Sequence, residues 1–269
     1  MDAQDPVFDR LASARWLDLS VIVSDNHPSW PGHEPFTRRV SNWFEPSPRS
    51  EERRKSLGPY ATGWWAVDEH TGTHFDAPAH FIPPPDSGLD HAGPLGSVTV
   101  EQVDLAKLRG PACVIDVRPL LGQAAPGHSP AILPDAIRGF EAAHGPISAG
   151  DVVLFRTDWD RNYLEGDARG RYIDDVLGAQ AVGWPAPTPA TVEHLADKGV
   201  ETIGIDAASL GPAEDGAATH VAGLSRGIAF VEGLARLGEL PPRGAFFLFL
   251  PVKVRGATGG LGRAVALLP

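Results

Sequence analysis

The sequence predicts a single α/β domain, with a mixed β-sheet and flanking helices. Short apolar runs typical of buried strands alternate with segments that carry helix start and stop residues, which favours crossover units. No internal repeat, low-complexity tract or linker divides the chain. Its 269 residues are enough to bury a sizeable core as one large domain. We therefore expect one domain over residues 1–269, in which residues 1–14 form a polar tail or a short helix.

The first quarter of the chain is expected to hold two strands separated by a charged loop. Residues 16–23 have strand composition and lead into the turn Trp30-Pro31-Gly32. Residues 41–59 are charged and contain proline, so we expect a solvated loop or a short exposed helix there. Residues 63–67 follow as a strand that leads into residues 69–80.

The remaining elements alternate between strands and helices. Strands are expected at residues 112–117, 151–156 and 202–206, and helices at residues 134–144 and 189–198. Each of these helices begins at a proline and is followed by a glycine, which is how helices commonly start and stop. Residues 81–96 and 161–183 show no regular pattern and are expected to be loops.

One stretch, residues 69–80, concentrates side chains that bind metals. It contains three histidines and one aspartate at offsets of four, two and four: His70, His74, Asp76 and His80. Zinc and manganese accept histidine nitrogens and carboxylate oxygens as ligands. Gly72 and Pro78 disfavour a regular helix, and in an extended segment His74 and Asp76 point to the same face. A lone histidine would more often be a surface residue, but this cluster indicates a divalent metal site.

Composition excludes several classes of partner. The formal net charge is −11, which argues against nucleic acid and anionic membranes, because both require a basic surface. The longest apolar run, residues 245–252, is too short to cross a membrane, and no signal peptide is recognisable. Cys113 is the one cysteine and lies in an apolar run, so we expect a buried core residue. A chain without an internal disulfide suits the cytoplasm.

The segment from His70 to His80 resembles the signature of the metal-dependent cyclase/hydrolase family, which includes bacterial kynurenine formamidase and isatin hydrolase. The resemblance extends from Trp16 to Leu268. It implies one α/β domain of the swivelling β/β/α type. It also implies a hydrolase that cleaves an amide or lactone bond of a small aromatic or cyclic molecule, such as an aryl formamide or an isatin. Members are usually homo-oligomers, so a dimer or tetramer is expected.

The same resemblance implies a role for individual residues. His70, His74 and Asp76 would hold a first metal, and His80 would donate and accept protons. Two further residues, His220 and Glu232, would complete a second metal position with Asp76. The metal would be Mn²⁺ or Zn²⁺.

The number of metals differs between the two branches that the sequence resembles. Residues 156–159, Arg-Thr-Asp-Trp, resemble the isatin-hydrolase branch, which is interpreted as binding one metal. Glu232 follows His220 at the separation found in the two-metal formamidases. An unpaired carboxylate in the apolar segment around Glu232 would cost roughly several kcal/mol, which coordination would remove. One or two metals per chain are therefore expected.

Two tryptophans are candidates for an aromatic wall around the substrate. Trp30 lies in the turn before the metal stretch, and Trp64 matches an aromatic position of the isatin-hydrolase branch. A surface-turn residue and a core-packing residue are equally good interpretations of the two. His27 and His33 lie near Trp30 and receive no role.

The expected chemistry follows from the metal. A bound divalent metal lowers the pKa of a water from about 16 to about 7 and polarises a carbonyl, a combination that suits hydrolysis. One alternative is a cyclase or dehydratase that acts through a metal-stabilised enolate. Another is a metal-binding protein without catalytic activity, against which His80 argues.

Overall fold

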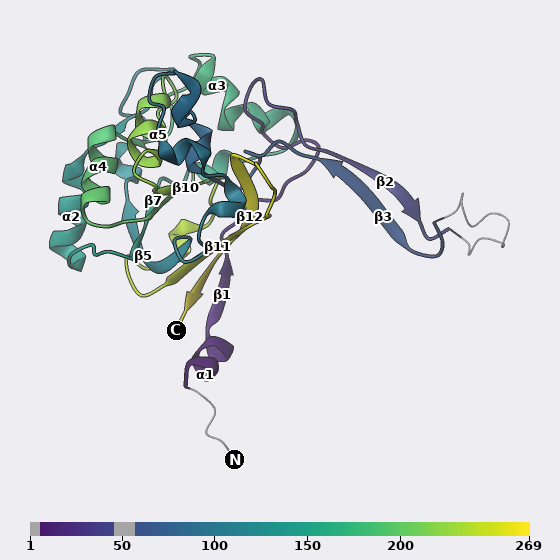
Figure 1. The fold of residues 1–269 in the computed structure, drawn as a ribbon, viewed down its shortest axis with the longest axis horizontal. Coiled ribbons are helices and arrows are strands. Elements are labelled where there is room, and N and C mark those ends of the chain that lie inside the picture. Colours follow the sequence, from purple (N-terminus) through teal and green to yellow (C-terminus); the bar gives the residue numbers. More distant parts are fainter. Residues whose placement is uncertain (1–5, 46–56) are drawn as a thin grey trace.

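The structure is a computed structural model, which describes residues 6–45 and 57–269. At its centre lies a β-sheet that closes on itself (Figure 1). The strands follow one another in the order β12 (Gly259–Leu268), β11 (Phe246–Pro251), β5 (Arg109–Asp116), β7 (Val152–Arg156), β9 (Thr202–Ile205), β10 (Ala229–Glu232) and β4 (His74–Asp76). Strand β4 then pairs with β12 and completes a seven-strand barrel-like sheet.

Both strand directions occur in this sheet. The pairs β5–β7, β7–β9 and β9–β10 are parallel, whereas β4, β11 and β12 pair antiparallel with their neighbours. Strand β1 (Arg15–Asp18) pairs antiparallel with β12 beyond the closed ring. The prediction of a single domain with a mixed sheet and helices is confirmed; the swivelling β/β/α type stays a prediction.

Helices cover one side of the sheet. Helices α2 (Pro134–His144), α4 (Pro189–Asp197) and α5 (Ala217–Leu224) lie together there, and α3 (Asp174–Leu177) lies nearer one end (Figure 1). The two predicted helices are confirmed, each with proline in its first turn. The Thr188 hydroxyl accepts a hydrogen bond from the backbone N–H of Thr191 and so caps α4.

Short elements occupy most of the remaining connections. A two-stranded sheet joins β6 (Ala131–Ile132) to β8 (Ala186–Pro187). The 3-10 turns are η1 (Pro78–His80), η2 (Pro85–Ser87), η3 (Pro94–Ser97), η4 (Val100–Gln102), η5 (Arg118–Leu120), η6 (Trp159–Asn162), η7 (Gly166–Tyr172) and η8 (Leu237–Glu239). Residues 81–96 and 161–183, expected as loops, contain short 3-10 turns between irregular segments, and residues 161–183 also contain α3.

The hydrophobic core has two parts, one on each face of the sheet. Along β7, Val153 and Phe155 belong to the part that includes helix residues, while Val152 and Leu154 belong to the part inside the closed sheet. This alternation is the period of two that a strand imposes. Burying each such side chain contributes about 1.5–3 kcal/mol. The strand ends are thereby fixed, which matters because the site is built on them.

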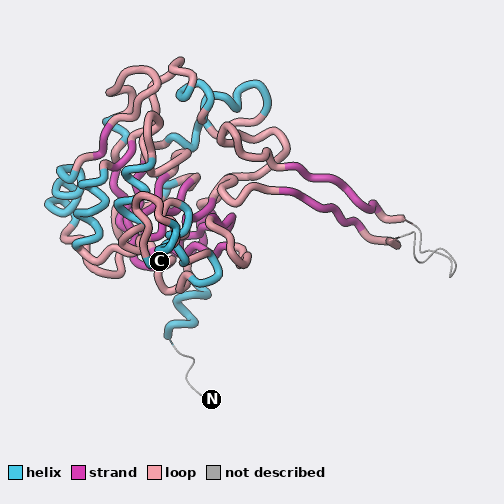
Figure 2. Tube along the Cα trace, turned by 45° about the horizontal axis from the view of Figure 1, so that its top comes forward, coloured by secondary structure: helices cyan, strands magenta, loops and turns pink. Residues whose placement is uncertain are grey.

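Two elements project from the body. Strands β2 (Thr37–Trp43) and β3 (Ala61–Ala66) form an antiparallel ribbon that extends far from the barrel, and α1 (Pro6–Ser13) extends in another direction (Figures 1 and 2). The prediction of a loop or helix over residues 41–59 is wrong for residues 41–43. These residues belong to β2, which continues to Trp43 through cross-strand pairing with β3. Residues 46–56 of that prediction lie outside the described residues, as do residues 1–5 of the expected tail. Among the residues described, no helix has the length and apolar character needed to cross a membrane.

Candidate metal centre

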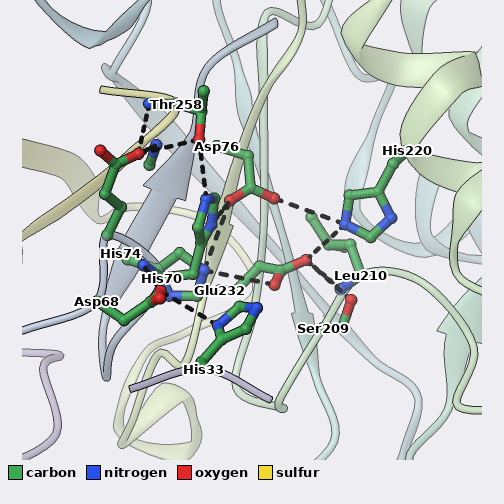
Figure 3. Close-up of polar contacts among 12 residues, drawn as sticks. His33, Asp68, His70, His74, Asp76, Ser209, Leu210, His220, Glu232 and Thr258 are labelled. Atoms are coloured by element: carbon green, nitrogen blue, oxygen red, sulfur yellow. Dashed lines mark hydrogen bonds and ion pairs between the residues drawn. The ribbon is translucent and has the colours of Figure 1, made fainter. Parts of the chain in front are cut away.

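The centre is built on β4, which lies between β10 and β12. Strand β4 pairs antiparallel with both neighbours, and His74 lies opposite Glu232 of β10. Because side chains alternate along a strand, Phe75 points into the barrel core while His74 and Asp76 share the other face. His74 Nε2 lies 3.5 Å from Asp76 Oδ1, as the sequence-based prediction of a common face required (Figure 3).

A tight turn before β4 brings His70 to the same place. Its Nδ1 lies 2.9 Å from Asp76 Oδ1, and its backbone N–H donates to Asp68 Oδ1 over 2.9 Å. Gly72 has φ +62°, and a Cβ there would lie 2.7 Å from Val23 Cγ2. The turn therefore requires glycine for both its backbone conformation and its space.

His220 and Glu232 approach from the opposite side. His220 lies on α5, and its Nε2 is 3.2 Å from Glu232 Oε1 and 3.5 Å from Asp76 Oδ2 (Figure 3). Glu232 ends β10, and its Oε1 also accepts hydrogen bonds from the backbone N–H of Leu210 and the hydroxyl of Ser209. Glu232 Oε2 lies 3.7 Å from His74 Nε2, so the two sides of the centre are in contact.

The five side chains form two triads that share one carboxylate. His70, His74 and Asp76 make one group, and Asp76, His220 and Glu232 make the other. Within each group, one potential ligand atom per residue lies within 4.8 Å of the others. All the predicted metal ligands are thus brought together, although they come from three separate parts of the chain.

The donor atoms fit a divalent cation. His74 Nδ1 lies 2.9 Å from Gly72 O, and His220 Nδ1 lies 2.8 Å from Gly216 O. A neutral imidazole that donates from Nδ1 carries a lone pair on Nε2, and in both residues Nε2 faces carboxylate oxygens. Two acceptors that face each other need a positive charge between them. Asp76 Oδ2 is also buried without a hydrogen-bond partner among the described residues, which leaves it free to coordinate.

Burial and mutual charge shift the titration of these groups. Burial alone would raise the pKa of the Asp76 carboxyl, but the imidazoles of His80, His220 and His70 outweigh it and hold that pKa well below its usual range. Burial would lower the pKa of His220, but the carboxylates of Asp76 and Glu232 raise it to about 10. The two carboxylates therefore favour a positive charge at His220, which is the charge that a metal ion would supply in its place.

The centre opens into a cavity of about 220 Å³. The cavity is lined by Trp30, His33, His70, His74, His80, Phe81, Ala208, Ser209, Pro212, Ala213, Gly216, Ala217, His220 and Glu232. Trp30 is therefore at the site, where its ring lies edge-on to Trp184 at 6.3 Å. A largely apolar wall faces the metal-binding side chains.

His80 reaches the cavity from η1, the 3-10 turn that starts at Pro78, one residue beyond the end of β4. Its ring stacks on that of His70 with 3.8 Å between the centroids. Burial lowers the pKa of His80 to about 4, and the neighbouring imidazoles add to this against the opposing effect of Asp76. The ring is therefore uncharged near pH 7, with a lone pair on one ring nitrogen.

The expectation that Trp64 lines the cavity is not met within this chain. Trp64 lies on β3, is 49% exposed and is absent from the cavity wall. The reason is that β3 leaves the body as part of the projecting ribbon. Its ring instead lies under the guanidinium of Arg39, 5.6 Å from the ring centroid.

Two residues that received no role from the sequence, His33 and Phe81, belong to the site. His33 lines the cavity and its Nδ1 lies 3.1 Å from Asp68 Oδ1, the atom that also accepts from the backbone of His70. Phe81 stacks on His220 at 4.3 Å. The one signal for His33 was its place directly after the Trp30-Pro31-Gly32 turn; Phe81 directly follows His80, but nothing in the sequence marks it as a ring partner.

Comparison with known proteins identifies similar sequences over most of the chain. The sequence profile of the Cyclase family matches residues 17–212. An isatin hydrolase from Roseibium aggregatum is 35% identical over 221 residues, covering 80% of this chain and 78% of that protein. A kynurenine formamidase from Erythrobacter litoralis is 29% identical and covers 93% of both chains.

Solved structures are similar over the whole length. An isatin hydrolase bound to the product analogue thioisatinate is 25% identical, with a TM-score of 0.79 and full coverage of both chains. Isatin hydrolase A from Ralstonia solanacearum is 26% identical, with the same TM-score and coverage.

Proposed function

Because the chain belongs to the Cyclase family, we propose that it is a metal-dependent hydrolase that cleaves an amide or lactone bond of a small aromatic or cyclic substrate. The observation that carries this proposal is the pair of triads that share Asp76 at one cavity. The named activities of the isatin hydrolase and kynurenine formamidase relatives support the bond type. The metal is Mn²⁺ or Zn²⁺, and the two triads support two ions per chain.

The protein side chains have separate tasks in this proposal. His70, His74 and Asp76 hold one metal, and Asp76, His220 and Glu232 hold the other. When bound, the metal lowers the pKa of a water from about 16 to about 7 and polarises a carbonyl. His80 takes a proton from the attacking water at a ring nitrogen and returns it to the leaving nitrogen or oxygen.

The cavity limits the substrate. A volume of about 220 Å³ is below the roughly 300–1,000 Å³ of pockets for drug-sized ligands, so a small molecule is required. Trp30 and Phe81 offer flat faces for a planar ring, and His33, held by Asp68, offers a polar group at the rim. An aryl formamide or an isatin has this combination of ring and carbonyl.

The proposal also covers the assembly of the enzyme, its partners and its location in the cell. The whole chain, residues 1–269, acts as one domain within a homo-oligomer, either a dimer or a tetramer. A net charge of −11 argues against nucleic acid and anionic membranes as partners. A single buried cysteine suits the cytoplasm, where thiols stay reduced.

Metal analysis and a substrate screen test the proposal together. Protein purified without added metal is expected to contain Mn or Zn and to hydrolyse members of a panel of aryl formamides, isatins and lactones. A chelator should abolish turnover, and added metal should restore it. Reaction in ¹⁸O-water should place the label in the product; a product without label would indicate a cyclase or dehydratase. Bound metal without turnover on the whole panel would indicate a non-catalytic metal-binding protein.

A further inference from the structure

We propose that a small compartment beside the metal centre is a subsite for a second, uncharged carbonyl group of the substrate, held by the hydroxyls of Tyr163 and Tyr172. The compartment has a volume of about 40 Å³. It adjoins the main cavity, with which it shares the lining residues Trp30, His33, His70, His74 and Ala208. A molecule bound at the metal-binding side chains can therefore extend into it. This role rests on the proposed function, to which it adds a second functional group of the substrate.

The two tyrosine hydroxyls have no hydrogen-bond partner among the described residues. The Oη atoms of Tyr163 and Tyr172 are buried, and only 4% of Tyr172 is exposed. A buried hydroxyl without a partner is unfavourable, and nearly all such groups in folded proteins are paired. Burial raises the pKa of both tyrosines, so each hydroxyl keeps its proton and can donate it to a hydrogen bond. Both hydroxyls therefore need an acceptor that the described residues do not supply.

The segment that carries these tyrosines packs against the metal-binding turn. Tyr163 follows η6 and Tyr172 ends η7, and their rings lie edge to face with 5.1 Å between the centroids. A Cβ at Gly72, in the turn before β4, would lie 3.8 Å from the Tyr163 hydroxyl oxygen. Gly72 also lines the compartment. The Tyr163 hydroxyl is therefore directed toward the compartment, at the wall that the turn before β4 forms.

The side chains around the compartment favour an uncharged acceptor. Among the described residues, no lysine or arginine lines it, whereas the carboxylate residue Glu34 does. A carboxylate of the substrate would lose its water there beside another carboxylate and gain no basic side chain in return, which is unfavourable. A carbonyl oxygen has two lone pairs and no net charge, so it can accept from both hydroxyls. The compartment therefore suits a ketone, an aldehyde or an amide carbonyl.

The volume of the compartment limits the group that enters it. A site for one water molecule needs roughly 10–15 Å³ on the same measure, so about 40 Å³ takes a group of roughly three heavy atoms. That is enough for a carbonyl with a methyl group and too little for a second ring. The aromatic ring of the substrate then stays in the main cavity beside Trp30. The substrate class is an aryl amide with an acyl group next to the ring position that bears the nitrogen.

Kinetics with a matched pair of substrates test the subsite. The compound ortho-formamidoacetophenone carries the second carbonyl, and ortho-ethylformanilide has a similar shape without it. The native protein should prefer the ketone, and Tyr163→Phe and Tyr172→Phe should each lower that preference in kcat/KM by roughly twofold to tenfold, as the loss of one hydrogen bond. The change should lie mainly in KM, because the hydroxyls bind a group that does not react. Tyr60→Phe is the matched control, since this third tyrosine is 47% exposed and does not line the compartment.

Binding of the reaction products provides a second measurement that needs no turnover. By calorimetry, ortho-aminoacetophenone should bind the metal-loaded native protein more tightly than ortho-ethylaniline, and each of the two phenylalanine variants should lose only this advantage. The anion ortho-aminobenzoate should bind weakly and equally to all of them. Thermal unfolding without ligand should show that Tyr163→Phe and Tyr172→Phe are at least as stable as the native protein, because each removes an unpaired buried donor.

Several outcomes would overturn the subsite and leave the proposed function intact. They are turnover of both substrates with the same preference in the native protein and in both phenylalanine variants, and equal affinity for the products with and without the ketone. A loss of ortho-aminobenzoate affinity in the variants would show that the subsite takes an anion instead. A fall in Tm for both variants beyond that of Tyr60→Phe would show that the hydroxyls serve the fold. Absence of turnover on every substrate would overturn the proposed function, and the product affinities would still decide the subsite.

Discussion

At the residue scale, Asp76 is the side chain on which both triads depend. Oδ1 lies near His70 and His74, and Oδ2 lies near His220. Only 1% of the residue is exposed, so water cannot satisfy its oxygens. A buried carboxylate between imidazoles is costly alone and favourable when a cation joins the groups. The two triads are therefore coupled through Asp76 and separable through their other members.

Glu232→Gln should separate the two triads. The amide keeps the shape of the side chain but removes its charge, so the second metal should bind more weakly by at least the roughly 10–100-fold that loss of an outer partner costs. The first metal should remain, because His70, His74 and Asp76 are untouched. Titration followed by elemental analysis measures both. Glu239→Gln, a surface carboxylate paired with Arg236, is the control. A native protein that saturates at one metal would contradict the two-metal assignment.

His80→Ala should leave both metals bound and lower kcat by at least ~100-fold, the usual scale for a general acid–base. The physical reason is that His80 lies in the cavity wall and is absent from both triads. Steady-state kinetics and metal analysis of the same sample measure the two effects. His128→Ala removes an exposed histidine as a control. Loss of metal together with activity would show that His80 is a ligand instead.

At the element scale, the site depends on how closely β12 approaches the metal-binding turn. Gly259 lies opposite Asp76 in the β12–β4 pair. A Cβ at Gly259 would lie 2.6 Å from Cε1 of the His70 ring, closer than real contacts allow. Thr258, the residue before it, has its hydroxyl 3.3 Å from His70 Nε2. The start of β12 thus fixes the position of this ring.

Gly259→Ala should therefore weaken the first metal site more than the second. The added methyl must displace His70, whereas His220 and Glu232 lie on other elements. Isothermal titration with Mn²⁺ or Zn²⁺ measures the two affinities. Gly139→Ala is the control, because its Cβ would meet nothing within 4 Å and it lies within α2. If Gly259→Ala leaves the affinity of the first metal site unchanged, the His70 ring moves aside without weakening metal binding.

At the scale of the whole molecule, closure of the sheet places strand ends from distant parts of the chain around one point. Asp206 shows how such an end is held. It follows β9, and its Oδ1 accepts from the backbone N–H and hydroxyl of Thr157 after β7, while Oδ2 accepts from the backbone N–H of Asp158. Asp158 in turn pairs with Arg156 at 2.8 Å. These hydrogen bonds join the ends of the neighbouring strands β7 and β9. The residues do not line the cavity, so the Arg156–Asp158 ion pair has a structural role.

The free energy of unfolding should depend on pH through the titration of Asp206. Burial raises the pKa of this carboxyl to about 7, from 3.8, against the hydrogen bonds of Thr157. The folded state therefore binds the proton more tightly than the unfolded state. The resulting stabilisation is fully present below pH 3.8 and is lost as the pH rises through about 7. Other carboxyls titrate as well. The effect of Asp206 is therefore measured as the difference in free energy of unfolding between the native protein and a variant that lacks this carboxyl.

Asp206→Asn should remove this part of the pH dependence. The variant should be less stable overall by about 1–3 kcal/mol, because its amide N–H₂ faces the backbone N–H of Asp158. Between pH 4 and pH 7, however, the native protein should lose stability relative to the variant. Urea unfolding at several pH values measures both. Parallel pH profiles would show that Asp206 is ionised throughout the range. Asp135→Asn, an exposed helix residue, is the control.

Much of the fold could be predicted from local sequence. The helices at 134–144 and 189–198 carry their own start and stop residues, and the buried strands carry continuous apolar runs. The extended metal-binding stretch was also predictable, because Gly72 and Pro78 are incompatible with a regular helix. The β2 strand was not, since its charged and polar residues form a strand only through pairing with β3. Closure of the barrel could not be predicted either, because β4 is three residues long and pairs with strands near the other end of the chain.

The chemistry of the site could thus be inferred from residue types alone, whereas its geometry depends on how the chain folds. Ligand type is a property of each residue, and a dense cluster such as residues 70–80 indicates metal without any fold. The contact of His220 and Glu232 with Asp76, the place of Trp30 and His33 in the cavity, and the exclusion of Trp64 from it depend on chain closure. Sequence spacing cannot encode these positions, because they result from pairing between strands that lie over a hundred residues apart, as in the β4–β10 register of His74 with Glu232.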